Sequence, residues 1–277
     1  MQEHYFDNNK IYYRTNEFKP DKITLVFIHG VSGSCSAWWP YEKIFENNYQ
    51  NKYNILTYDL RGHGMSKKFP HYSDYAVKNF AHDLHDLVTY LNISKFVLIT
   101  NSFGTLVGLE YIKFWRASVV ANIFTSPEIY LNEGLKAKIM RITFGTLAGI
   151  ASLLPFNPKP RGHVDYSKHV GATDWDTKRN LADIMNTGLQ ADFYTLRQSL
   201  NPNQEYYLEK INVPTLIVHG EKDSMVPIKN AIRMSREIKN SEFKSIPNID
   251  HNTAHNAVKE MSQAMESFVE KNKNLIY

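Results

Sequence analysis

One serine in the stretch KFVLITNSFGTLVGLEYIK, residues 95–113, stands where it could act as a nucleophile. Residues 96–100 read as a buried strand, and the apolar spacing that follows residue 104 is typical of a helix. Ser102 lies in the few residues between them. So tight a turn lifts the hydroxyl out of the strand end, above a helix N-terminus whose N–H groups are unpaired. This arrangement favours attack on a carbonyl group, with the oxyanion held by those N–H groups.

The turn resembles the nucleophile elbow of the α/β-hydrolase family, normally written G-x-S-x-G. Gly104 occupies the family's last glycine position, Gly108 is a second small residue nearby, and Thr100 replaces the first glycine. Because threonine is small but β-branched, we expect the turn to be slightly more open than in the family.

Three further segments resemble motifs of the same family and follow its order along the chain. They are HGVSGS at residues 29–34, DLRGHGMS at 59–66 and HGEKDSMVP at 219–227. A loop that carries His251 comes after the last predicted strand, where the family has its histidine. The resemblance covers residues 22–126 and 211–268, which leaves the segment between them without a family motif.

The resemblance implies a catalytic triad of Ser102, Asp223 and His251, which follow one another in the family's order of serine, acid and histidine. An aspartate at position 223 can accept the imidazole Nδ1–H, fix the tautomer and stabilise the imidazolium. Glu221 is the nearest rival acid, although it follows a glycine too directly. His255 is the alternative base, but we expect it to lie already within the last helix.

An oxyanion hole would complete this machinery. The resemblance implies that its donors are the backbone N–H groups of Phe103, which follows the nucleophile, and of Val31 in the HGVSGS loop. Each well-placed donor lowers the barrier by roughly 3 kcal/mol. We interpret His29 and His63 as structural residues of their loops rather than as catalytic groups.

Composition narrows the class of protein. The chain has 277 residues, of which 43% are hydrophobic and 22% charged, so it is long enough for one sizeable α/β domain with an insertion. A formal net charge of +4, dispersed along the chain, gives no sign of a nucleic-acid partner. A single cysteine, Cys35, excludes a disulfide framework and a cysteine-based zinc site. His82 and His85 read as a solvated helix face rather than as metal ligands. We expect no metal and no organic cofactor.

The apolar content of the chain also bears on its location. Residues 1–22 are polar, unlike a secretory signal peptide. The longest apolar stretch, residues 142–156, is too short to span a bilayer. We therefore expect a cytoplasmic protein without stable membrane insertion.

Strand patterns alternate with helix patterns over most of the chain, which predicts an α/β fold with a mostly parallel, twisted sheet and helices on both of its faces. A hairpin is expected in 4–15, strands in 22–30, 54–66, 96–101, 119–127, 214–227 and 241–250, and helices in 75–92, 103–113, 230–238 and 252–272. Residues 128–200 break this alternation because they are helical with a proline-rich interruption. We interpret them as a cap inserted into a hydrolase core formed by residues 1–127 and 201–277.

The first interpretation of function is hydrolysis of a carboxylic ester through an acyl-enzyme. A serine in the elbow excludes the dehalogenase and epoxide hydrolase branches, which use an aspartate there. The alternatives are a C–C bond hydrolase of aromatic ring-cleavage products, whose elbow is similar to N-S-x-G, an acyltransferase or thioesterase, and a non-catalytic receptor with a hydrolase-like fold. The cap is rich in apolar residues, so we expect a small-molecule ester with an apolar acyl or aromatic part, bound by Leu147, Ile150 and Trp38. A homodimer is a possible assembly.

Overall fold

The computed structural model describes residues 1–8, 10–47, 52–131, 133–201 and 207–276. Its strands are β1 (Gln2–Phe6), β2 (Ile11–Thr15), β3 (Thr24–Ile28), β4 (Asn54–Tyr58), β5 (Phe96–Asn101), β6 (Val119–Thr125), β7 (Thr215–Gly220) and β8 (Ser241–Ile246). Its α-helices are α1 (Trp39–Asn47), α2 (Val77–Tyr90), α3 (Phe103–Trp115), α4 (Gly134–Ser152), α5 (Thr177–Thr187), α6 (Leu189–Ser199), α7 (Ile228–Glu237), α8 (Thr253–Asn256), α9 (Val258–Lys271) and α10 (Lys273–Ile276).

The strands form one sheet in the order β1-β2-β4-β3-β5-β6-β7-β8. All pairs from β4 to β8 are parallel, whereas β1 pairs with β2, and β2 with β4, in antiparallel register. Every residue of β3 and β4 is buried, as expected for strands covered on both faces. The predicted α/β fold with a mostly parallel sheet is therefore confirmed.

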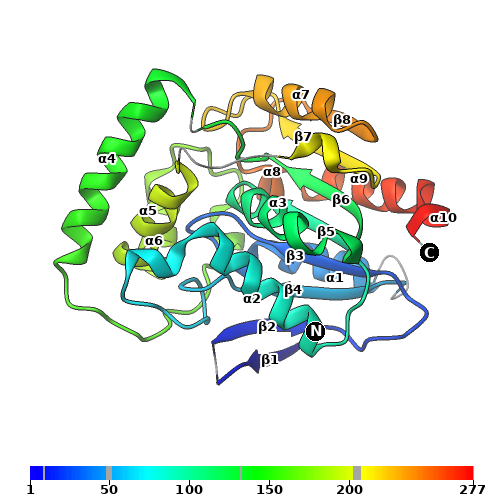
Figure 1. Ribbon diagram of the computed structural model, residues 1–277, viewed down its shortest axis with the longest axis horizontal. Coiled ribbons are helices and arrows are strands. Elements are labelled where there is room, and N and C mark those ends of the chain that lie inside the picture. The colour runs from blue at the N-terminus through cyan, green and yellow to red at the C-terminus, as the bar shows by residue number, and fades with distance from the viewer. Residues whose placement is uncertain (9, 48–51, 132, 202–206, 277) are drawn as a thin grey trace.

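Helices cover both faces of the sheet (Figure 1). Apolar side chains of α2, α3 and α7 form one core layer, which includes Phe80, Leu84, Val107 and Met234. Those of α1 and α9 form the other, which includes Phe45, Met265 and Phe268. The two layers hold the carboxyl ends of the central strands in fixed positions, and ligands bind at that edge in open α/β sheets.

Two local predictions had different outcomes. The predicted hairpin is present, and its turn places Asp7 and Asn8 at positive φ, whereas Asn9 lies outside the described residues. The predicted closing helix is instead divided into α8 and α9, because Ala257 between them departs from helical geometry at φ −128.

Residues 128–200, which we call the cap segment, contribute α4, α5 and α6 and, in the part that the structure describes, no strand. These three helices lie side by side beyond one end of the sheet (Figure 1). Among all helices of the described residues, none has the length and apolar character needed to cross a lipid bilayer.

Candidate active site

The turn between β5 and α3 holds Ser102 in a strained backbone conformation, with φ 51 and ψ −121. The Ser102 N–H donates to the carbonyl of Thr125 at 3.0 Å, which ties the turn to the neighbouring strand. Gly104 lies so close to β3 that a Cβ there would be 2.7 Å from the carbonyl oxygen of His29. A glycine is required at that position, and it lets α3 begin directly beneath the serine.

Thr100 fits inside the same turn, although the family has a glycine at this position. Its side chain is fully buried, and its hydroxyl forms a 2.9 Å hydrogen bond with the hydroxyl of Thr105 in the first turn of α3. The hydroxyl is thus satisfied without contact with the candidate nucleophile.

The structure brings the three predicted triad residues into one hydrogen-bonded chain. His251 Nε2 lies 2.8 Å from Ser102 Oγ, and His251 Nδ1 lies 2.8 Å from Asp223 Oδ2. The acid and histidine loops meet because Gly220 has no side chain, and a Cβ there would be 2.4 Å from the carbonyl of Asp250. This is the arrangement in which a histidine can take the serine proton while the aspartate fixes its tautomer.

Asp223 is held as an anion by its surroundings. Its Oδ1 accepts the backbone N–H groups of Met225 and Val226 at 2.9 and 2.8 Å, and its Oδ2 also lies 3.2 Å from His219 Nε2. Burial alone would raise the pKa of this carboxyl, but its hydrogen bonds to His219 and His251 keep the pKa well below the usual range. The aspartate can therefore stabilise an imidazolium without taking its proton.

The rejected alternatives point away from Ser102 or have other partners. His255 lies in α8 as predicted, where its ring stacks on Tyr166 at 4.1 Å and burial lowers its pKa to about 3. Glu221 accepts the hydroxyl of Ser245. Asp250 accepts two backbone N–H groups and makes no hydrogen bond to the neighbouring imidazole.

The two predicted oxyanion donors lie on either side of the nucleophile. Phe103 follows Ser102 at the start of α3, and Val31 lines the same cavity. A Cβ on Gly30 would be 3.1 Å from the Cβ of Ser102, so the loop after β3 passes directly beside the serine. In the described part of the chain, neither donor N–H has a hydrogen-bond partner. Their role in holding an oxyanion stays a prediction.

The loop after β3 is fixed from the core and from the cap segment. On the core side, His29 Nε2 accepts the backbone N–H of Leu60 at 3.0 Å, in keeping with a structural role. On the cap side, the Thr187 hydroxyl donates to the carbonyl of Ser32 at 2.8 Å, and the Ser32 hydroxyl donates to Asp192. Asp192 is fully buried, burial raises its pKa to about 7, and its Oδ2 has no hydrogen-bond partner.

Sequence reasoning missed Glu128, a buried carboxyl beside the nucleophile. Ser102 Oγ lies 3.4 Å from Glu128 Oε2, and burial raises the pKa of this glutamate. Residue 128 follows the end of β6 with only two residues between, and a carboxyl so close to a strand end was the signal that could have found it. The sequence pattern alone places Glu128 at the start of the cap.

The charge around His251 predicts the pH dependence of catalysis. Burial alone would lower the pKa of His251, but the hydrogen bond and charge of Asp223, with the charges of Glu128 and Asp174, outweigh it, and the pKa is raised. A general base must be neutral, so kcat/KM should fall as pH drops through a pKa above the ordinary histidine value of about 6.5. Glu128→Gln should move this acidic limb to lower pH.

The measurement is the pH profile of kcat/KM for wild-type protein and Glu128→Gln, with Glu221→Gln as the matched control. Glu221 is exposed and bonds to Ser245, so its substitution should leave the profile in place. An unchanged acidic limb in Glu128→Gln would mean that Glu128 carries no charge at the pH where His251 titrates.

A cavity of about 350 Å³ covers Ser102 and His251, and this size suits a small molecule. Its apolar lining comes largely from α4, α6 and the loops nearby and comprises Val31, Ala37, Leu131, Met140, Phe144, Ile184, Phe193, Leu196, Leu200, Met225 and Val226. Glu128, Asp183, Asp192 and Arg179 add charged groups, and Arg179 is paired with Asp183 at 2.9 Å. The lining of the cavity is thus largely apolar, with a smaller set of charged groups.

The predicted substrate-binding residues do not line this cavity, and that prediction is wrong for all three. Trp38 is fully buried in the core, where its ring packs against Phe27 and Tyr41 at 5.1 and 5.3 Å. Ile150 points outward from α4 and is 57% exposed. Leu147 is half-buried but lies beyond the part of α4 that reaches the cavity.

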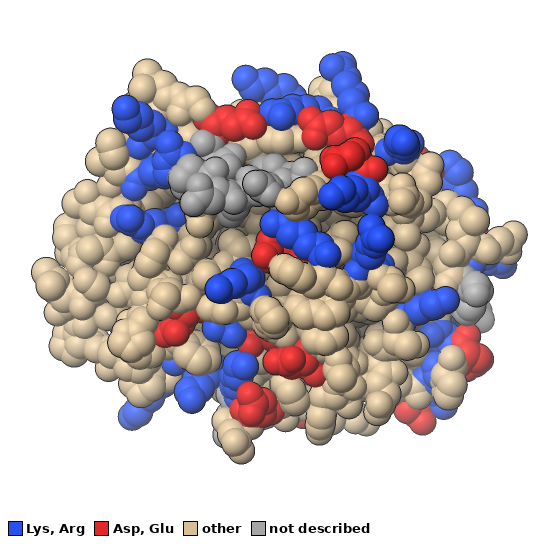
Figure 2. Space-filling model, in the orientation of Figure 1, with Lys and Arg blue, Asp and Glu red and all other residues tan. Residues whose placement is uncertain are grey.

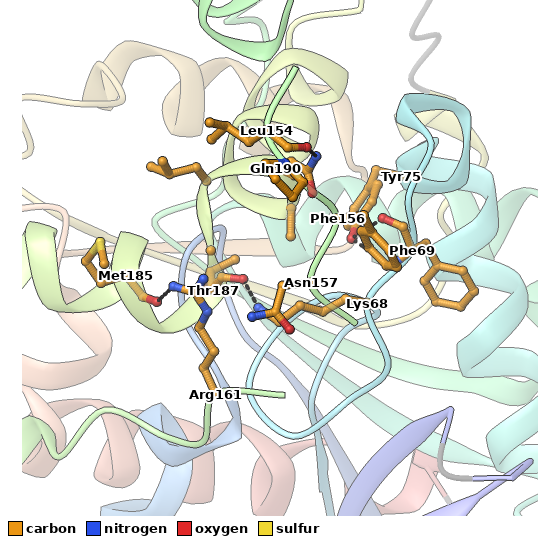
Figure 3. Close-up of a pocket in the computed structure, with 14 residues that line it drawn as sticks. Lys68, Phe69, Tyr75, Leu154, Phe156, Asn157, Arg161, Met185, Thr187 and Gln190 are labelled. Carbon is orange, nitrogen blue, oxygen red and sulfur yellow. Dashed lines mark hydrogen bonds between the residues drawn. The ribbon is translucent and has the colours of Figure 1, made fainter. Parts of the chain in front are cut away.

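A second cavity lies between the loop after β4, the segment that follows α4 and the start of α6 (Figure 3). No triad residue lines it. Lys68 Nζ donates to the carbonyl of Thr187, and Arg161 donates to the carbonyl of Met185 at 2.6 Å. The Lys68 contact joins the cap segment to the core, and the Arg161 contact joins two parts of the cap segment.

One group of side chains has the geometry to share a cation. Cys35, Asp59 and His163 each offer a ligand atom, and these atoms lie within 4.8 Å of one another. His163 Nε2 already makes a 2.8 Å contact with Asp59, which links the cap segment to the core. His82 and His85 in α2, which the sequence pattern places on one helix face, pack against the ring of Trp115.

Comparison with known proteins agrees with the fold. The family model described as serine aminopeptidase, S33, matches residues 19–257, and the chain therefore belongs to this family of α/β hydrolases. It is 26% identical over 259 residues to a non-heme chloroperoxidase of Burkholderia pyrrocinia, which covers 88% of this chain and 90% of that protein. It is 24% identical over 230 residues to 3-oxoadipate enol-lactonase 1 of Acinetobacter baylyi, with 80% and 79% covered.

Solved structures share the same fold. A thermophilic esterase from Thermogutta terrifontis superposes with a TM-score of 0.71 at 18% identity, covering 96% of this chain and 95% of that chain. The α/β hydrolase MGS-M2, from a deep-sea metagenome library, gives a TM-score of 0.74 at 19% identity, with 97% of each chain covered. At these identities the likeness concerns the fold alone.

Proposed function

We propose that the protein is a serine hydrolase that cleaves carboxylic esters of small molecules through an acyl-enzyme. The observation that carries the proposal is the chain of 2.8 Å contacts from Ser102 through His251 to Asp223, under a cavity of small-molecule size. Membership of a hydrolase family adds support, as does a relative named as an enol-lactonase, because a lactone is a cyclic ester.

In the proposed reaction the proton moves between Ser102 and His251, which are already in contact. Ser102 Oγ attacks the ester carbonyl carbon while His251 Nε2 accepts its proton. The N–H groups of Val31 and Phe103 would hold the oxyanion, and Asp223 would stabilise the imidazolium. The imidazolium then gives the proton to the leaving alcohol, and a water molecule, deprotonated by the same ring, releases the acid and restores the serine.

Hydrolysis of a chromogenic short-chain ester tests this proposal directly. A non-catalytic receptor would bind such an ester without turnover, and a C–C hydrolase would turn it over far more slowly than a ring-cleavage product. A thioesterase would favour the matched thioester over the oxygen ester.

The acyl group is expected to lie against the apolar lining of the cavity. Activity on p-nitrophenyl esters should then rise from acetate to medium-chain acids, by about fourfold in kcat/KM for each methylene, since burying one is worth about 0.8 kcal/mol. Phe144→Ala should weaken this gain because Phe144 lines the cavity. Ile150→Ala, on the outer side of the same helix, is the matched control and should retain it.

The outcome is read from the slope of log kcat/KM against acyl chain length in the wild-type protein, Phe144→Ala and Ile150→Ala. If acetate is the best substrate and the slopes do not differ, the apolar lining of the cavity does not bind the acyl group.

A further inference from the structure

Helix α4 exposes a stripe of large apolar side chains on the side opposite its buried residues. Ala137, Ala148 and Ala151 are buried. Leu135, Ile139, Ile142 and Ile150 recur at helical spacing on the opposite side, where they are 73%, 57%, 65% and 57% exposed. When only water covers the outer side of a helix, polar residues are expected on that side instead.

The uncovered apolar side chains continue past the end of α4. Leu153, which directly follows α4, is 84% exposed, and every residue from 152 to 161 is exposed. Scattered exposed apolar residues are ordinary, but a contiguous set of this kind marks a surface that binds something. We call the exposed side chains of α4 and the side chain of Leu153 the outer cap face.

The charged residues of α4 and of the segment after it are all basic, and Glu133, which directly precedes α4, is paired with Arg233 at 3.0 Å. Residues 134–164 contain five lysines and arginines and no aspartate or glutamate. Lys136 and Lys138 are exposed in the first turns of α4, on the two sides of the apolar stripe. Along the left margin of Figure 2, where α4 lies, the surface is mostly uncharged and is interrupted by basic but not by acidic side chains.

We propose that the outer cap face is a docking surface for an anionic lipid bilayer, on which α4 lies in the plane of the interface. Apolar side chains that enter the acyl boundary and cations that meet lipid headgroups are the two requirements for interfacial binding. A second copy of this chain fits the surface less well. A two-fold interface would bring the cations of two α4 helices together with no carboxylate from this segment between them.

Docking would set the active-site cavity beside the bilayer. Met140 and Phe144 line the cavity from the inner side of the same helix whose outer side would contact lipid. A substrate dissolved in the bilayer, with an apolar acyl chain, would then have a short path to Ser102. This consequence for the substrate rests on the proposed ester hydrolysis, whereas the docking itself does not.

The test is co-sedimentation of the full chain, as Ser102→Ala, with vesicles of phosphatidylcholine alone and with an added third of phosphatidylglycerol. We expect binding to the anionic vesicles that weakens when salt shortens the Debye length from about 10 to about 3 Å. Leu135→Asp should weaken binding at least tenfold. Leu275→Asp is the matched control, because Leu275 is 71% exposed against 73% for Leu135 and lies in α10 at the other end of the molecule (Figure 1), and it should bind as before.

Three results would overturn the proposal: no binding to either vesicle, equal binding by Leu135→Asp and Leu275→Asp, or a dimer in analytical ultracentrifugation that Leu135→Asp alone dissociates. Failure of the docking proposal is told apart from failure of the proposed function by a second assay. In that assay, protein that keeps Ser102 hydrolyses a water-soluble short ester. Leu135→Asp should leave that hydrolysis unchanged.

Discussion

Replacing Ser102 with alanine is expected to reduce ester hydrolysis by at least about ten thousand-fold while the protein stays folded. Among the described residues, the serine oxygen is the one nucleophile with a hydrogen bond to His251 Nε2, at 2.8 Å, and loss of this triad member removes covalent catalysis. Alanine and serine differ by one oxygen, so the turn at φ 51 gains no new clash. The measurement is kcat/KM on a chromogenic ester, with circular dichroism and thermal unfolding to establish that the variant is folded.

A serine-directed fluorophosphonate gives an independent readout for the same variant. It should label the wild-type protein once, with the mass added to the peptide that contains Ser102, and it should not label Ser102→Ala. Most of the wild-type activity surviving in a folded Ser102→Ala protein would refute the assignment of the nucleophile.

The second large effect is expected at His251 but not at His255. His251→Ala should lower kcat/KM by at least about ten thousand-fold, because its Nε2, 2.8 Å from Ser102 Oγ, is the group that takes and returns the serine proton in the proposed reaction. His255→Ala should cost no more than about tenfold, since its ring stacks on Tyr166 and makes no hydrogen bond to the serine. The pair is a matched control because both histidines line the same cavity.

The two variants are compared through kcat/KM at a pH well above the titration of His251, with binding of an uncleaved substrate analogue as a check on the cavity. If His255→Ala is as inactive as His251→Ala while both bind the analogue, the choice of base between the two histidines is wrong.

The positions of the triad residues could be predicted because each depends on a local pattern. A buried strand that ends just before Ser102 and passes at once into a helix indicates the elbow, and the motifs that follow in the family's order support it. Asp223 and His251 likewise follow the ends of β7 and β8, and parallel strands bring such ends to one edge of the sheet. The resemblance of these loops to the family's motifs, together with the strand pattern, was sufficient to predict that the three side chains meet.

The lining of the cavity could not be predicted in the same way. Trp38 and Ala37 are neighbours in the sequence, yet only Ala37 lines the cavity, because a one-residue difference turns a side chain into the core. Asp192 lies far from the triad residues in the chain and reaches the cavity only through the packing of the cap segment on the core. The apolar spacing within the cap segment or within the core does not indicate how the two pack together.

What the sequence by itself determined was the α/β hydrolase architecture, the elbow at Ser102 and the loops that carry its partners, because these follow from apolar periods and short motifs. Only the tertiary structure decided which side of α4 faces the cavity. That helix is apolar around most of its circumference, so its period alone could not separate Phe144, which faces inward, from Ile142 and Ile150, which face outward. The choice was made by the close approach of the buried alanines to the rest of the cap, a contact between segments that are distant in the chain.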